Sequence, residues 1–199
     1  MHKLTKCLVV GAMLVASAST ALAQYTPAGL SFLQAVRDRD GAKVEELLGA
    51  DGSTVINFRN DRGEAALHIV AARRDQTYLG YLLGKGADAN IQAKSGDTPL
   101  IVAARIGDAD AVDRLLRSRA RVDLANRAGE TPLIIAVQQR HPPVVKRLLE
   151  AGADADRKDN ATGRSARDYA NEDRRNPDLL KLLETVKPAK ASGVAGPKL

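Results

Sequence analysis

Residues able to carry acid–base or metal chemistry are few in this chain. Its 199 residues include three histidines and one cysteine, so a His-built metal site is disfavoured and no intramolecular disulfide can form. A Ser–His–acid arrangement would have to use His68 or His141, and no serine lies in a nucleophile-elbow context. We interpret both histidines as structural residues, with His68 hydrogen-bonded to the backbone of a turn.

Other chemical motifs are equally weak. The glycines occur singly, which disfavours a phosphate-binding loop. Asp88-Ala89-Asn90 has suitably spaced oxygen ligands but lacks the rest of a calcium loop. We therefore expect no catalytic residue, no metal site and no cofactor.

Composition limits the class of protein further. The chain is 44% hydrophobic, which suits one globular domain with a buried core. Its formal net charge is +6, from 30 Lys and Arg against 24 Asp and Glu. Aromatic residues make up only 3%, which disfavours a platform on which nucleic-acid bases stack.

The N-terminus has the three regions of a secretory signal peptide. Lys3 and Lys6 precede an apolar run over 8–18, which is followed by the small-residue cleavage pattern Ala21-Leu22-Ala23. The run is shorter than the ~20 apolar residues that span a bilayer. We predict a signal peptide over 1–23 with cleavage between Ala23 and Gln24. Cleavage would lower the net charge from +6 to +4 and remove the only cysteine.

The rest of the chain repeats itself at a period of 33 residues. Three segments share one pattern: GEAALHIVAARRD, GDTPLIVAARIGD and GETPLIIAVQQRH. Each is followed by a second apolar stretch, and the leucines of both stretches recur in phase, as at Leu115 and Leu148. Because no single unit can bury its leucines, neighbouring units must stack.

The start of each unit has the chemistry of a helix N-terminus. Thr98 and Thr131 are suitable N-cap residues, and each is followed by a proline at the first helical position. Gly86 and Gly152 fit helix C-termini that need a left-handed residue. Each unit is therefore expected to hold two short helices joined by a turn.

These features resemble the ankyrin repeat family. The residues that carry the resemblance are Gly96-Asp97-Thr98-Pro99-Leu100, Gly129-Glu130-Thr131-Pro132-Leu133, Leu67-His68 and Gly86-Ala87-Asp88-Ala89-Asn90. The resemblance implies an all-α solenoid of about five stacked helix-turn-helix units with short β-turn fingers. We place the ankyrin repeat domain at 24–186, with units at about 27–59, 60–92, 93–125, 126–158 and 159–186, and a flexible tail at 187–199.

In such a stack the partner usually meets the finger tips and the exposed side of the first helices. Matching by repeat position gives these partner-binding candidates: Asp61, Arg62, Glu64, Arg73, Lys94, Ser95, Asp97, Arg105, Ile106, Arg127, Ala128, Glu130, Gln138 and Gln139. Arg105 is expected to anchor an acidic group beside the apolar Ile106. Arg114, Arg117 and Arg147 fall on the opposite, convex side, where we expect a solvated face.

The charges on the concave side are mixed, which favours a protein partner over nucleic acid. We expect a monomeric, periplasmic, non-catalytic binding protein that does not insert into a membrane after signal cleavage. A secreted effector acting on a target in another cell is the alternative. An enzyme with an unrecognised site is a third and less favoured hypothesis.

Overall fold

The computed structural model describes residues 19–51, 55–173 and 175–186. These residues form ten α-helices and no strand longer than an isolated bridge between Lys158 and Ser165. The helices are α1 (Ser19–Asp38), α2 (Gly41–Asp51), α3 (Ala66–Ala72), α4 (Gln76–Gly84), α5 (Pro99–Ile106), α6 (Ala109–Arg117), α7 (Pro132–Gln138), α8 (Pro142–Glu150), α9 (Ala166–Glu172) and α10 (Pro177–Thr185). The expected all-α repeat solenoid is confirmed.

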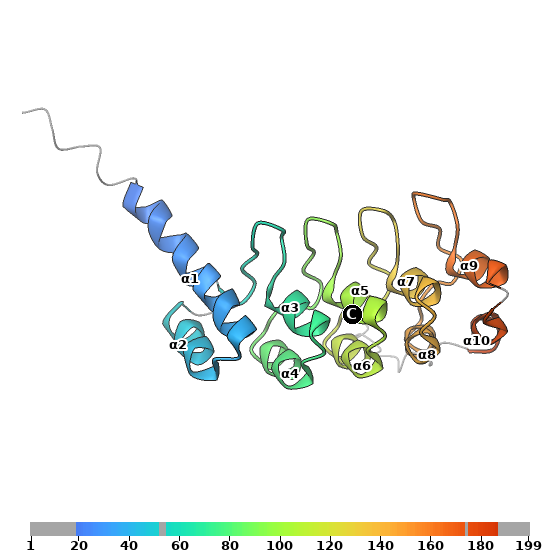
Figure 1. Ribbon diagram of the computed structural model, residues 1–199, viewed down its shortest axis with the longest axis horizontal. Coiled ribbons are helices and arrows are strands. Elements are labelled where there is room, and N and C mark those ends of the chain that lie inside the picture. The colour runs from blue at the N-terminus through green and yellow to red at the C-terminus, as the bar shows by residue number, and fades with distance from the viewer. Residues whose placement is uncertain (1–18, 52–54, 174, 187–199) are drawn as a thin grey trace, which may run out of the picture.

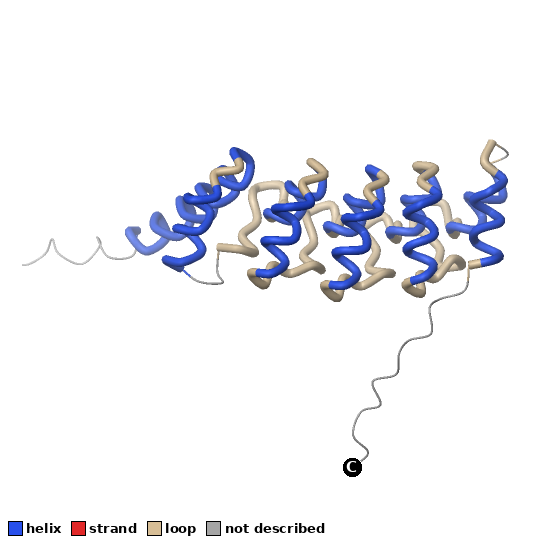
Figure 2. The backbone as a smooth tube through the Cα atoms, turned by 90° about the horizontal axis from the view of Figure 1, so that it is seen from below, coloured by secondary structure: helices blue, strands red, loops and turns tan. Residues whose placement is uncertain are grey.

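The helices form five antiparallel pairs arranged in a row (Figure 1). The first helices of the pairs pack against one another from α1 through α3, α5 and α7 to α9. The second helices pack in the same way from α4 through α6 and α8 to α10. Long loops project between successive pairs on one side of the row (Figures 1 and 2). We call the loops over 57–64, 90–97, 123–130 and 156–164 fingers one to four.

Local capping decides where the helices begin. The hydroxyl oxygens of Thr98 and Thr131 accept hydrogen bonds from main-chain N–H groups three residues later, each at 3.2 Å. A proline follows each threonine at the start of α5 and α7. Gly86 and Gly152 lie after second helices with φ of 90° and 89°. The capping threonines and the left-handed glycines predicted from the sequence are therefore confirmed.

The core runs without interruption along the stack. The recurring leucines of the first helices, Leu67, Leu100 and Leu133, are at most 1% exposed. Those of the second helices, including Leu115 and Leu148, are fully buried. Alanines at the interfaces between units, such as Ala103 and Ala104, are buried as well and keep neighbouring helices close.

The first unit differs from the others in spacing. Asp40, Asp75, Asp108 and His141 occupy the same turn, because each main-chain N–H donates to the carbonyl five residues earlier. Asp40 and Asp75 are 35 residues apart, whereas each later pair of successive turn residues is 33 apart. The unit also has the longest first helix of the described residues, since α1 spans 20 residues.

The predicted targeting and tail segments lie largely outside the described residues. This holds for Lys3, Lys6, the apolar run over 8–18 and the tail over 187–199. The predicted cleavage site between Ala23 and Gln24 lies within α1. Among the described helices, none has the length and apolarity needed to cross a membrane.

Candidate functional site

The fingers are joined to one another by main-chain hydrogen bonds. Lys94 N donates to Arg62 O at 2.9 Å, and Arg127 N donates to Ser95 O at 3.0 Å. Asn160 N continues the series with a bond of 2.8 Å to the carbonyl of the third finger. The tips of all four fingers are therefore fixed relative to their neighbours, and so are the side chains that they present.

The repeating glycines permit this close approach. Gly63, Gly96 and Gly129 have φ of 76°, 84° and 77°, a region that L-residues with side chains rarely occupy. A Cβ atom on any of them would lie 2.5 to 2.6 Å from the main-chain nitrogen of the next finger. Both conformation and space therefore require glycine, which explains its period of 33 residues.

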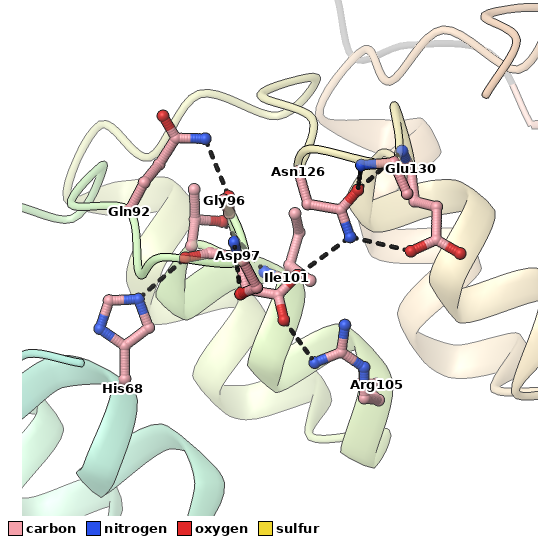
Figure 3. Close-up of polar contacts among 11 residues, drawn as sticks. His68, Gln92, Gly96, Asp97, Ile101, Arg105, Asn126 and Glu130 are labelled. Atoms are coloured by element: carbon pink, nitrogen blue, oxygen red, sulfur yellow. Dashed lines mark hydrogen bonds and ion pairs between the residues drawn. The ribbon is translucent and has the colours of Figure 1, made fainter. Parts of the chain in front are cut away.

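Asparagines organise two of the fingers from within. The Asn126 Oδ1 accepts bonds from the main-chain N–H groups of Ala128 and Glu130, both at 3.0 Å. Its Nδ2 donates to Glu130 Oε2 at 2.8 Å and to Asp97 Oδ1 of the preceding finger at 3.0 Å (Figure 3). Asn60 bonds the first finger in the same way. Sequence reasoning missed this role, although the two asparagines stand at equivalent positions two units apart.

Both histidines form hydrogen bonds with main-chain groups, as predicted. His68 is buried, its Nδ1 accepts from Ala65 N at 3.1 Å, and its Nε2 lies 2.9 Å from the carbonyl oxygen of Asp97 (Figure 3). Since Nδ1 accepts, Nε2 carries the proton and donates to that carbonyl. Burial lowers the pKa of His68, which keeps the ring neutral. His141 likewise bonds through Nε2 to the carbonyl of Arg105, at 3.1 Å.

Two predicted partner-binding arginines are engaged within the chain. Arg105 Nη1 lies 3.0 Å from Asp97 Oδ2, and Asp97 also accepts from Asn126. Burial opposes ionisation of Asp97, but bonds from Arg105, Asn126 and Ser95 outweigh it and lower its pKa. Arg73 donates to Asp75 and to the carbonyls of Val36 and Arg37. Arg105 is therefore already paired with an acid of the neighbouring finger, and its role as an anchor for an acidic group of a partner stays a prediction.

The remaining partner-binding candidates differ in their exposure and in the bonds that their side chains form. Arg62 pairs loosely with Glu64 at 3.2 Å, and Glu130 accepts from Asn126. Ser95 is exposed, and its hydroxyl accepts a bond from Asp97 N. Ile106, Ala128 and Gln138 are partly buried. The candidates that are exposed and make no side-chain hydrogen bond or ion pair within the described residues are Asp61, Lys94, Arg127 and Gln139.

The convex side is less uniformly solvated than expected. Arg114 is half-buried, and its guanidinium lies against Gly80 of α4, where an added Cβ would be 2.8 Å from Nη1. Arg147 lies 3.5 Å from Asp113 across α6 and α8. Both side chains connect neighbouring units, so the expectation of a wholly solvated face is wrong. Arg117 is exposed, as expected.

A further set of arginines bridges the units at the turns between paired helices. Arg39, Arg74 and Arg140 are left-handed residues with φ of 59°, 58° and 56°. Arg39 bonds to Asp75 of the next unit at 2.8 Å, and Arg140 bonds to Asp173 at 2.6 Å. Arg74 donates to the carbonyl of Ile106. The bonds from Arg39 lower the pKa of Asp75, and those from Arg140 lower the pKa of Asp173.

One hollow of about 460 Å³ opens between the last two units. It is lined by Val137, Gln138, Arg140, Tyr169, Glu172, Asp173 and Arg175. Its charged groups include two arginines and two carboxylates, and Arg140 already pairs with Asp173. Within the described ranges, no group of three or more His, Cys, Asp or Glu side chains is placed to hold a metal ion.

Comparison with known families agrees with this architecture. A family model described as ankyrin repeats, in three copies, matches residues 32–105 and 71–159. The chain therefore belongs to the ankyrin repeat family. Ankyrin repeats are generally protein–protein interaction modules and are typically non-catalytic. No curated protein matches the chain significantly.

Proposed function

We propose that this protein is an exported, non-catalytic interaction module that binds a partner protein through its fingers and the adjoining side of its first helices. The observation that carries the proposal is a contrast within the fingers. Their backbones are locked by repeated hydrogen bonds, whereas the exposed residue at the equivalent tip position is Asp61, Lys94 or Arg127. A fixed scaffold with varied side chains is suited to selective binding, because little conformational entropy is lost on association.

Export is proposed from the N-terminal sequence pattern and favours the periplasm as the site of action. Intact-mass measurement on the exported protein tests this step. A mass corresponding to residues 24–199 is expected, and a mass that retains residues 1–23 would contradict it. Recovery from culture supernatant instead of periplasmic extract would favour the secreted effector.

The binding face is tested by blocking it with bulky side chains. Ser95→Trp combined with Gln139→Trp places one indole on a finger and one at the end of a first helix, and both residues are exposed. The matched control is Thr77→Trp with Ser118→Trp, which are exposed residues on and after the second helices. Affinity capture from periplasmic extract, read by mass spectrometry, should lose its specific partner only with the first pair. If only the control pair abolishes capture of the partner, and both variants melt like the wild type, the proposed binding face is wrong.

A further inference from the structure

Two exposed cations at the finger tips form no ion pair within the part of the chain that the structure describes. Lys94 and Arg127 occupy equivalent positions on fingers two and three, and both are exposed. Their backbone nitrogens donate to the preceding finger in the same way, so the two side chains project from matching points of adjacent tips. Among the described residues, neither has a carboxylate within salt-bridge distance.

Three acids of fingers two to four are engaged within the molecule. Asp97 is paired with Arg105 and bonded to Asn126. Glu130 accepts from Asn126, and Asp159 is buried within the fourth finger. These three carboxylates therefore bond to other groups of the molecule, and none of them pairs with Lys94 or Arg127.

The charges differ between the first and the fourth finger, which lie on either side of Lys94 and Arg127. The equivalent tip residue of the first finger is the acidic Asp61, and the exposed Arg62 beside it is paired with Glu64. The fourth finger has Asn160 at the tip and the exposed Arg157 and Lys158 earlier in the same loop. The neighbours Ser95 and Ala128 are small. At the equivalent tip position the exposed cations therefore lie on fingers two and three, and finger four adds Arg157 and Lys158.

We propose that fingers two to four bind an acidic, extended segment of the partner protein, with carboxylates paired to Lys94 and Arg127. This deepens the proposed function, on which it rests, by naming the chemistry of the partner. Complementary charge of this kind mainly raises the rate of association and the selectivity, and it weakens as salt screens the charges. Binding should therefore be strongest at low ionic strength.

The test uses a fluorescent peptide of alternating glutamate and glycine, with a glutamine-for-glutamate peptide as the neutral probe. Fluorescence anisotropy at low salt should show binding of the glutamate peptide and much weaker binding of the glutamine peptide. Lys94→Glu combined with Arg127→Glu should raise the Kd of the glutamate peptide about tenfold or more. The control, Arg117→Glu with Arg121→Glu, makes the same change in net charge away from the finger tips and should have a much smaller effect.

Three outcomes would overturn this inference. They are no binding of the glutamate peptide, an equal loss in the two charge-reversed variants, and tighter binding of a DNA oligonucleotide than of the peptide. The first two would exclude an acidic-peptide site at the tips, and the third would identify a nucleic-acid surface. If the glutamate peptide does not bind, but the indole pair at Ser95 and Gln139 abolishes capture of the natural partner, the proposed function stands and this inference is wrong.

Discussion

Asp123 takes part in a hydrogen bond that recurs between units, and it has a carboxylate where the equivalent residues have an amide. The side-chain oxygens of Asn57, Asn90 and Asp123 each accept a bond from a main-chain N–H that lies 31 residues later, at 2.9, 2.7 and 3.0 Å. The first two are neutral amides, and Asn90 also donates to the carbonyl of Arg119. Burial raises the pKa of Asp123 and outweighs the bond from the Asp154 N–H, which lowers it. A charged acceptor is therefore poorly placed at this position.

We predict that Asp123→Asn stabilises the protein by up to about 1 kcal/mol at neutral pH after solvent screening, because the amide keeps the bond without a partly buried charge. The folded-state pKa is raised, so wild-type stability falls as pH rises from the unfolded-state value of about 3.9. The gain should therefore shrink below about pH 4. Thermal melts across this range test it. Asn90→Asp should be destabilising at neutral pH, and a stabilising effect there would contradict the argument.

A second residue-scale prediction concerns the fourth finger. Burial opposes ionisation of Asp159, but hydrogen bonds from Tyr169, Thr162 and Gly163 outweigh it and lower its pKa to about 2. Tyr169→Phe removes the Oη donor, which lies 2.6 Å from Asp159 Oδ2. The variant should lose about 1.5 to 3 kcal/mol at pH 7, the range for hydrogen bonds to charged groups.

The pH dependence gives this prediction a sharper test. Because the folded-state pKa of Asp159 is depressed, its contribution is present above about pH 4 and is lost as pH falls toward 2. The difference between wild type and Tyr169→Phe in urea unfolding should narrow over that range. A difference that stays constant from pH 7 to pH 2 would assign the loss to packing of the ring edge.

At the scale of elements, neighbouring units are held by contacts that lie at several levels. Main-chain bonds join the finger tips, and the arginines at the helix turns join the opposite ends of the first helices. Leucines and alanines fill the space between. Each finger is therefore an ordered part of the stack, and the glycines of fingers one to three make room for the next finger.

We predict that Gly96→Ala destabilises the protein by at least about 2 kcal/mol. Alanine is strained at φ of 84°, and its Cβ would lie 2.6 Å from Arg127 N. The matched control is Gly49→Ala in α2, where nothing lies within 4 Å of the added atom. That helical substitution should be neutral or stabilise by up to about 1 kcal/mol. Chemical unfolding of both variants measures the contrast, and equal effects would show that the finger contact contributes nothing.

At the scale of the whole molecule, the main contacts among the described helices join neighbouring units, so damage in one unit should spread locally. Leu115→Ala and Leu148→Ala should each cost about 2 to 5 kcal/mol, because both leucines are fully buried. Hydrogen exchange should show the largest loss of protection in α5 to α8 and a smaller loss in α1 and α2. Wild-type melting of both variants would contradict the assigned packing.

The repeat pattern predicted the features that depend on local sequence or on the period itself. Capping by Thr98 and Thr131 depends on residues within one turn, and burial of Leu115 follows from the recurrence of apolar positions. The engagement of Arg73 and Arg105 could not be predicted in this way. Their acceptors depend on how helix ends and fingers of neighbouring units come together in three dimensions. Matching by repeat position therefore selected both exposed residues and residues whose side chains are bonded within the molecule.

The links between finger tips have a consequence for how such a protein can grow. They join main-chain nitrogen to main-chain oxygen, so they place no demand on side-chain identity apart from the glycine that makes room. A tandem duplication of residues 93–125 would present the same donors and acceptors at both of its boundaries. The gene can thus lengthen the molecule in whole modules, and the reach of its surface can evolve separately from the chemistry displayed there.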